Sequence, residues 1–341
     1  MKKKLGLFNR IVYWINLVVA FLLVVSFLLP YIPPKNFPTI SLLSLVVFPL
    51  IIINSLFVLY WLFKLKLKIV VSLFVLLIAH FHFGSFFQFS TEENNTKTEN
   101  SLTILSFNVR LFNAYEDDPQ PKVVSKTFAS IVEAQQSDII CIQEYYADNE
   151  VDFSEYPYKF IYFKEKNKLG HAIFSKYPLI NKHSFDFSHT YNNSISADII
   201  KGKDTIRIYN LHLQSLGIKP RVSYLQEIDK DKFKERITRG FVKQQEQTEI
   251  ILKHKQSSKY PVLISGDFNN TPFSYVYHKL SANLNDAFIE KGNGIGTTYL
   301  FDSFPTRIDY IFASDKFKIV KFENINTTFS DHYPVSATVT W

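Results

Sequence analysis

The stretch PVLISGDFNNTP, residues 261–272, determines how we interpret the C-terminal two thirds of this chain. An apolar run is followed by an aspartate and an asparagine two residues apart, Asp267 and Asn269, in a loop that contains glycine and proline. This pattern predicts a buried strand that ends at a sheet edge, where α/β proteins bind their ligands. One such strand is weak evidence, because turns have the same composition. The pattern gains meaning if other strands repeat it.

Other strand-like runs follow residue 101, with few helices among them. The expected strands are LTILSF (102–107), DIICIQ (138–143), KFIYF (159–163), AIF (172–174), ISADII (195–200), IRIYNLHL (206–213), PVLIS (261–265), RIDYIF (307–312) and VSATVTW (335–341). Helical spacing of apolar residues appears only in 122–136 and 238–255. Many strands with few helices favour two packed sheets flanked by helices over a doubly wound single sheet.

Polar residues recur where these strands end. They are Asn108, Glu144, Asn210, His212, Asp267, Asn269, Asp309, Asp331 and His332. Any one of them taken alone is more often a cap, a turn residue or a satisfied core histidine. Their recurrence at successive strand ends predicts a shared site at one edge of the sandwich.

The order GDFN, RIDYIF, SDH, together with GHAIFSKYPL at 170–179, resembles the endonuclease/exonuclease/phosphatase superfamily, the DNase I-like fold. The resemblance covers residues 102–341. It implies an α/β fold, a four-layer αββα sandwich, that hydrolyses phosphate esters with a divalent metal at one edge.

The resemblance also implies a role for each matched residue. Glu144 corresponds to the principal metal ligand, and Asn108 and Asp331 lie in or beside the same shell. Asp267 corresponds to the carboxylate that aligns or deprotonates the attacking water, and Asn269 to the amide that holds the phosphate. His332 corresponds to the histidine at the scissile phosphate, Asp309 to the carboxylate that orients its ring, and His212 to a second histidine of the deoxyribonuclease and sphingomyelinase branches.

These residue types suit the chemistry independently of the family. Displacement at a phosphodiester places charge on the phosphate oxygens, so the site needs a cation, hydrogen-bond donors and a proton acceptor. The oxygen ligands Glu144, Asp331 and Asn108 favour Mg²⁺ or Mn²⁺, because zinc prefers histidine and cysteine.

Three further features remain open. Arg307 shares a strand face with Asp309, so it either contacts phosphate or forms an ion pair that supports Asp309. Asn210, two residues before His212, is a candidate substrate-binding group. The charged segment 216–239 is either a solvated loop or helix, which we favour, or a basic flap beside the site.

The first 90 residues differ from the rest in charge and hydropathy. They contain eight Lys or Arg and no Asp or Glu, which leaves 30 basic and 31 acidic residues beyond position 90 (38 − 8 = 30). Three apolar stretches, Ile11 to Leu29, Thr39 to Phe63 and Ile69 to about Phe83, approach the roughly 20 residues that span a bilayer. We expect three transmembrane helices in a membrane anchor, residues 1–89. A polar linker, 90–101, and a catalytic domain, 102–341, would follow.

Basic residues precede the first span and lie between the second and third. The positive-inside rule therefore places the N-terminus in the cytoplasm and, after three spans, the catalytic domain outside it, periplasmic or extracellular on a bacterial-type inner membrane. A cleaved signal peptide is disfavoured, because no small-x-small site follows the first span.

The sequence thus favours a membrane-anchored, metal-dependent phosphodiesterase. Its substrate is a nucleic acid or a phospholipid headgroup. The soluble part has a formal charge of −1 (30 − 31), which weakens the nuclease interpretation without excluding it, since a local groove can be basic. The alternative is a catalytically inactive binding or anchoring protein on the same fold, which is disfavoured because every matched position is filled.

Overall fold

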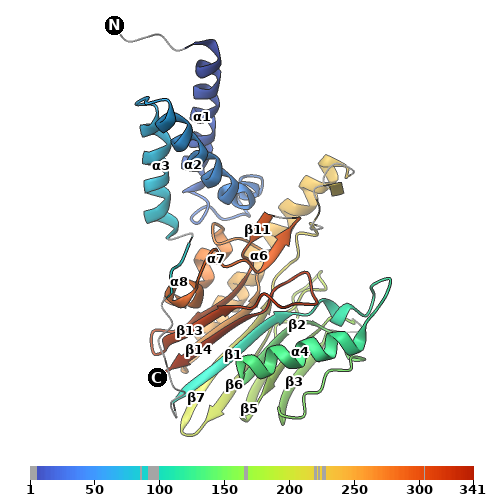
Figure 1. The fold of residues 1–341 in the computed structure, drawn as a ribbon. Coiled ribbons are helices and arrows are strands. Elements are labelled where there is room, and N and C mark those ends of the chain that lie inside the picture. Colours follow the sequence, from blue (N-terminus) through green and yellow to red (C-terminus); the bar gives the residue numbers. More distant parts are fainter. Residues whose placement is uncertain are drawn as a thin grey trace.

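The computed structural model describes residues 6–84, 87–90, 100–164, 168–218, 221, 223–224, 228–302 and 304–341. A helical bundle formed by the N-terminal residues stands on a β-sandwich (Figure 1). Most of the expected linker, residues 91–99, lies outside the described residues.

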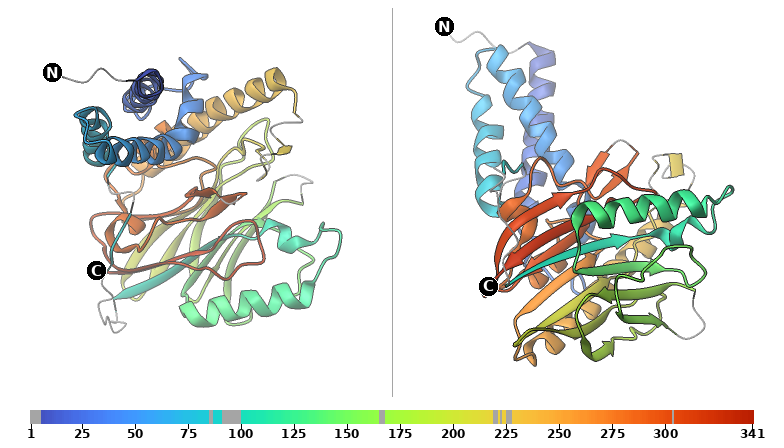
Figure 2. Two further views of the ribbon diagram at one scale, coloured as in Figure 1. Left: turned by 45° about the horizontal axis from the view of Figure 1, so that its top comes forward. Right: turned by 60° about the horizontal axis from the view of Figure 1, so that its bottom comes forward.

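Two six-stranded mixed sheets pack face to face (Figures 1 and 2). The first has the order β13 (Lys318–Asn324), β14 (Val335–Thr340), β1 (Ser101–Asn108), β2 (Ile139–Tyr145), β4 (Gly170–Ser175) and β3 (Tyr158–Phe163). The second has the order β5 (Leu179–Ser184), β6 (Ile195–Lys201), β7 (Asp204–His212), β8 (Val262–Asp267), β12 (Asp309–Ala313) and β9 (Asn285–Asp286). The central pairs β1–β2 and β7–β8 are parallel, so each sheet brings two C-terminal strand ends to one edge.

The two-residue period of the strands separates three apolar layers. Ile104 and Ile208 belong to the core between the sheets. Leu105, the next residue along β1, packs instead with Phe128 of α4 (Pro121–Gln135). Ile251 of α6 (Lys230–Gln256) packs on the outer face of the second sheet, together with α7 (Tyr275–Leu280). Helices therefore cover both outer faces, as Figure 2 shows, and the expected α/β sandwich is confirmed.

Each expected strand is present with ends within two residues of its predicted bounds. The sequence interpretation missed β5, an edge strand that is largely exposed, and β13, whose alternation is interrupted by a bulge between Ile319 and Lys321. It also missed the short elements around the site. These are η2 (Arg110–Asn113), α8 (Ala287–Lys291) and the hairpin of β10 (Tyr299–Phe301) and β11 (Phe304–Thr306).

Three antiparallel helices form the N-terminal bundle: α1 (Leu7–Ser26), α2 (Val47–Phe63) and α3 (Ile69–Phe83). A buried polar chain joins them. Asn16 Nδ2 donates to Ser72 Oγ at 2.5 Å, and Ser72 Oγ donates to Asn54 Oδ1 at 2.9 Å. Trp61 Nε1 donates to Asn16 Oδ1 at 2.9 Å. Interhelical hydrogen bonds of this kind help to fix the rotation of apolar helices against one another.

The expectation of three spans needs correction. Among the described residues, two helical segments are long and apolar enough to cross a membrane, Leu7–Ser26 and Ile40–Phe63. The third apolar stretch forms a helix that is shorter than a span. It ends at Phe83, followed by Gly84 in the left-handed region at φ 79°. Its 15 residues reach about 22 Å at 1.5 Å per residue, short of a hydrocarbon core of about 30 Å.

The bundle is joined to the sandwich next to the GDFNN loop. Thr271 Oγ1 donates a 2.9 Å hydrogen bond to the main-chain oxygen of Ser44 in η1 (Ile40–Val46), the 3-10 segment that leads into α2. Phe83 at the end of α3 contacts Phe273 edge-on at 5.0 Å between ring centroids. The helices therefore adjoin the edge of the sandwich that carries the polar strand ends.

Candidate active site

The polar residues expected at strand ends converge at one edge of the sandwich, with the exception of Asn210. Asn108 ends β1, and its Nδ2 donates across the sandwich to Asp267 Oδ2 on β8 at 3.0 Å. The same Nδ2 lies 3.4 Å from Glu144 Oε1 on β2. His212 ends β7, and its Nε2 lies 3.7 Å from Asp267 Oδ2 and 3.8 Å from Glu144 Oε1. Residues from both sheets thus form one site.

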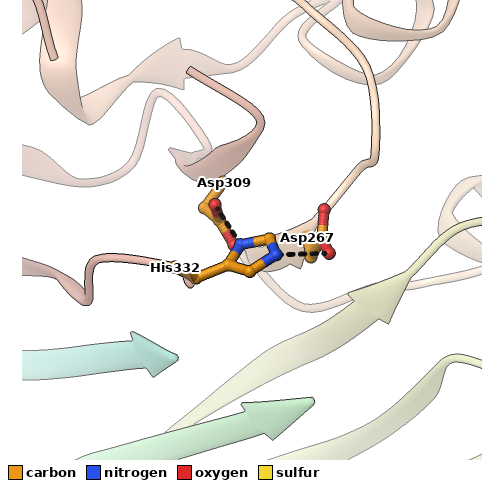
Figure 3. A group of neighbouring side chains, drawn as sticks. All are labelled: Asp267, Asp309 and His332. Atoms are coloured by element: carbon orange, nitrogen blue, oxygen red, sulfur yellow. Dashed lines mark hydrogen bonds and ion pairs between the residues drawn. The ribbon is translucent and has the colours of Figure 1, made fainter. Parts of the chain in front are cut away.

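Asp309, His332 and Asp267 form a row of side chains (Figure 3). Asp309 Oδ2 lies 3.0 Å from His332 Nδ1, and His332 Nε2 lies 3.7 Å from Asp267 Oδ2. Burial of the imidazole lowers its pKa, but the carboxylates of Asp309 and Asp267 outweigh burial and raise the pKa of His332 to about 10. The ring is therefore an imidazolium at neutral pH and can donate a proton or a hydrogen bond.

Asp267 is 1% exposed and is held by its neighbours along the chain. Its Oδ1 accepts from the main-chain N–H of Asn269 at 2.7 Å, and its Oδ2 accepts from Asn269 Nδ2 at 3.2 Å. Burial raises the pKa of Asp267 to about 7, although the charge of His332 opposes the rise. A carboxylate with a pKa near neutrality is suited to accept a proton from water.

Asn269 has left-handed backbone geometry at φ 51°, which asparagine tolerates better than most residues. Its Nδ2 also donates to the main-chain oxygen of Leu213 at 3.1 Å. Both amide protons are thus used within the protein. In this arrangement Asn269 orients Asp267. Asn269 could donate to a phosphate only after its hydrogen bond to Leu213 or to Asp267 had broken.

His212 lies behind the two carboxylates rather than in the cavity. The side-chain amide of Asn192 is 2.8 Å from its Nε2, and Nδ1 is buried without a hydrogen-bond partner among the described residues. Burial lowers the pKa of His212 well below its usual value, and His171 and His332 lower it further. His212 is therefore a neutral imidazole, in contrast to His332.

Glu144 and Asp331 face the same cavity and offer carboxylate oxygens. Glu144 sits at φ 55° beside a bulge between Gln143 and Tyr145, and its side chain retains 26% exposure. Burial raises the pKa of Glu144, and the charge of Asp331 raises it further while His332 opposes this. Two carboxylates that repel each other at a cavity wall fit a hard divalent cation. Asn108 lies beside them, with its Nδ2 toward Glu144 and its Oδ1 accepting from the main-chain N–H of Arg110 at 3.1 Å.

The row Asp309, His332 and Asp267 also offers ligand atoms within 4.8 Å of one another. His332 Nδ1 is already engaged with Asp309 Oδ2 at 3.0 Å, so the row is arranged for proton transfer, and Glu144 and Asp331 offer separate carboxylate oxygens at the same cavity.

Both expectations for Arg307 are wrong. It lies before β12, is 8% exposed, and its Nη1 donates to Asp286 Oδ2 at 2.7 Å. Its guanidinium carbon lies 4.6 Å from the ring centroid of Phe288 and 4.9 Å from that of Tyr310. It neither pairs with Asp309 nor lines the active-site cavity. Arg307 instead joins α8 and β12 beneath the site.

Asn210, expected to bind substrate, is buried between the sheets. Its Oδ1 accepts from Gln143 Nε2 at 2.6 Å, and its Nδ2 donates to the main-chain oxygens of Ile142 and Ala172 at 2.9 Å each. All three partners lie on the first sheet, whereas Asn210 lies on the second. Its structural role is to hold the two sheets in register below the catalytic edge.

Sequence reasoning missed several supporting residues. Thr298 Oγ1 accepts from the main-chain N–H groups of Ile308 and Asp309 and so positions Asp309. Tyr299 lies 5.0 Å from the ring of His332. Neither residue follows a long apolar strand, so no sequence pattern marks Thr298 or Tyr299 as a site residue.

A cavity of about 1440 Å³ opens at this edge. Asn108, Glu144, Asp267, Asn269, Asp331 and His332 line one part of it. Leu42, Leu45, Val46 and Pro49, from the N-terminal helices, line another. Part of the charged segment 216–239 also borders the cavity, whereas residues 219, 220, 222 and 225–227 of that segment lie outside the described residues.

This fold and site define a phosphoesterase-like sandwich. The chain belongs to the endonuclease/exonuclease/phosphatase family, whose model matches residues 105–332. Residues 9–86 match a second model, which is described only as a domain of unknown function. No curated protein sequence matches the chain.

Solved structures share the fold at low sequence identity. A family protein from Bacteroides thetaiotaomicron is 20% identical with a TM-score of 0.54, covering 71% of this chain and 98% of its own. TDP2 from D. rerio, in complex with single-strand DNA product, is 14% identical with a TM-score of 0.55, covering 71% and 99%. The human Nocturnin catalytic domain is 16% identical with a TM-score of 0.50, covering 72% and 96%. These similarities establish the fold alone.

Proposed function

We propose that this protein is a membrane-anchored phosphodiesterase that uses a divalent metal and water to cleave a phosphate ester. The observation that carries the proposal is the row Asp309, His332 and Asp267, which ends at a cavity that Glu144 and Asp331 also face. Imidazolium, carboxylate and oxygen ligands at one cavity supply what phosphodiester hydrolysis requires.

Asp267 accepts a proton from the attacking water, whose oxygen forms the new bond to phosphorus. The ester P–O bond opposite breaks, and the leaving oxygen takes up a proton from solvent water and departs as an alcohol, while Asp267 returns its proton to solvent. His332, held by Asp309, donates to a phosphate oxygen as charge develops there. Asn108 and Asn269 hold Asp267 in place through the hydrogen bonds at 3.0 and 2.7 Å.

Glu144, Asp331 and Asn108 would hold Mg²⁺ or Mn²⁺, and a bound cation would neutralise the phosphate and the carboxylates that otherwise repel it. His212, neutral and buried, has its Nε2 within 3.8 Å of a carboxylate oxygen of both Glu144 and Asp267, and would limit the space into which either carboxylate can move.

The bundle would anchor the enzyme in a membrane. Lys68 Nζ lies 3.9 Å from the ring of Tyr13, and Tyr60 donates to Asn9, so the start of α1 and the loop after α2 share one end of the bundle. That end also carries Arg10 and Lys64, and it lies away from the sandwich (Figure 1). By the positive-inside rule the sandwich then faces away from the cytoplasm, which requires α3 to cross as well. Its 15 residues, about 22 Å long, would do so with local thinning of the bilayer.

Hydrolysis of bis(p-nitrophenyl) phosphate by the full chain in detergent tests the proposal. We expect turnover with Mg²⁺, none with EDTA, and a loss of at least about a hundredfold in His332→Ala. If the folded wild-type protein bound Mg²⁺ but turned over no phosphodiester, it would be an inactive binding protein on this fold. Fusion of reporter enzymes after residue 341 tests the orientation; activity of a cytoplasmic reporter would contradict it.

A further inference from the structure

We infer that the substrate of the proposed phosphodiesterase is a membrane phospholipid, whose apolar chain lies in a groove that the N-terminal helices help to build. This inference rests on the proposed function. The groove is the apolar part of the active-site cavity, and we define it by Leu42, Leu45, Val46, Pro49, Ile218 and Phe233.

The groove and the catalytic residues form one cavity. Its volume of about 1440 Å³ exceeds the range of about 300–1,000 Å³ that small-molecule pockets occupy. Leu216 and Ile237 are buried beneath it, and Leu42, Leu45 and Phe233 pack against them. A phosphate placed at His332 would therefore have an apolar surface beside it, rather than open water.

The groove wall is attached to the catalytic loop. Asn270 follows Asn269, and its Nδ2 donates to Gln244 Oε1 of α6 at 2.7 Å. Thr271 then donates to the main-chain oxygen of Ser44, one residue before Leu45. Both helical walls of the groove are thus held to the loop that carries Asp267.

The groove also lies where a membrane lipid could enter it. Leu42, Leu45 and Val46 belong to Ile40–Phe63, one of the two segments long and apolar enough to cross a membrane. They lie at the end of that segment next to the sandwich, and the side chain of Val46 is 43% exposed. If the helix spans the bilayer, the groove opens at the bilayer surface, and a lipid needs to move only its headgroup and the adjoining part of one chain to reach the site.

The charges around the cavity fit a single phosphate better than a nucleic acid backbone. Among the described residues that line it, the basic groups besides His332 are Arg110, Arg221 and Arg236. Arg236 donates to the main-chain oxygen of Gly217 at 2.8 Å, and Arg110 pairs with Glu116 at 2.8 Å. Nucleic acid binding depends on many phosphate contacts from free basic groups, and the chain beyond residue 90 has a formal charge of −1.

The test compares three substrates of the full-length protein: phosphatidylglycerol and phosphatidylethanolamine vesicles with reconstituted protein, supercoiled plasmid DNA, and bis(p-nitrophenyl) phosphate. We expect Mg²⁺-dependent release of a phosphate-containing product from the vesicles, detected by mass spectrometry. Leu45→Ser should lower the ratio of lipid to bis(p-nitrophenyl) phosphate turnover by about tenfold, from lost apolar contact. Leu56→Ser, on an exposed face of α2, should not change this ratio.

A second measurement does not depend on substitutions. Alkylphosphocholines of increasing chain length should inhibit bis(p-nitrophenyl) phosphate hydrolysis more strongly as the chain grows, at concentrations where each is monomeric. Inhibition independent of chain length, or cleavage of DNA with intact vesicles, would overturn the lipid inference while leaving phosphodiester hydrolysis in place. Absence of bis(p-nitrophenyl) phosphate turnover would instead count against the proposed function itself.

Discussion

The hydroxyl of Thr271 donates a 2.9 Å hydrogen bond to the main-chain oxygen of Ser44, a residue 227 positions earlier in the chain. Both groups are buried. Thr271 follows Asn269 by two residues, and Ser44 precedes the helix α2. One hydrogen bond therefore joins the catalytic loop to the segment that we propose as a membrane anchor.

Replacing Thr271 with valine removes this donor at nearly constant volume. The buried main-chain oxygen of Ser44 then loses its hydrogen-bond donor, which lowers the free energy of unfolding by about 1–3 kcal/mol. We expect faster amide hydrogen exchange in residues 40–46, with unchanged exchange in β1 and β14. Thr205→Val, on β7 away from the bundle, is the control. Unchanged protection of 40–46 would mean that packing alone holds this segment.

Asp309→Asn should lower kcat by roughly 10²–10⁴-fold with a smaller change in KM. The amide keeps the shape of the side chain but removes the charge that favours the imidazolium form of His332. Steady-state kinetics on bis(p-nitrophenyl) phosphate measure the effect, and Asp117→Asn, on an exposed loop, serves as the matched control. Equal kcat in both variants would remove Asp309 from the proposed mechanism.

Mg²⁺ should raise the thermal stability of the wild-type protein. A ligand that binds only the folded state stabilises by about 2.7 kcal/mol at 100 times its Kd. Glu144→Gln should reduce the rise in Tm measured by calorimetry, because Glu144 is one of the proposed metal ligands and loses its charge. An equal rise in wild type and variant would show that Mg²⁺ binds elsewhere.

Arg307→Met should destabilise the fold rather than weaken substrate binding. Breaking a buried ion pair costs about 3–5 kcal/mol, since the remaining charge of Asp286 stays buried. Denaturant unfolding should show this loss, and the double variant with Asp286→Asn should recover part of it. A raised KM with unchanged stability would restore the phosphate-binding role that the sequence suggested.

Acid should destabilise the protein through His171. This residue is fully buried, neither ring nitrogen has a hydrogen-bond partner among the described residues, and burial lowers its pKa to about 3. The unfolded state binds the proton more readily, so stability is lost as pH falls below about 6.5, by about 2 kcal/mol at pH 5. His171→Asn should flatten the dependence of unfolding free energy on pH between 5 and 7. If wild type and variant lost unfolding free energy equally between pH 7 and pH 5, groups other than His171 would cause the acid sensitivity.

The sequence by itself determined the strands and the set of residues at their ends. Strand periodicity and the change from apolar to polar at a strand end are local properties, so Asn108, Glu144, Asp267 and His332 could be named before the structure. The apolar helices were equally visible, and α3 ends at Phe83 as its apolar stretch does, although its 15 residues are shorter than a hydrocarbon core requires.

Only the tertiary structure decided what the remaining side chains contact. Arg307 pairs with Asp286 and Asn210 bonds to the opposite sheet, because neighbours along a strand need not be partners across layers. The groove beside His332 combines Leu45 with Phe233 of α6, nearly two hundred residues apart. Such contacts depend on how layers pack, and packing is set by the whole chain rather than by any local pattern.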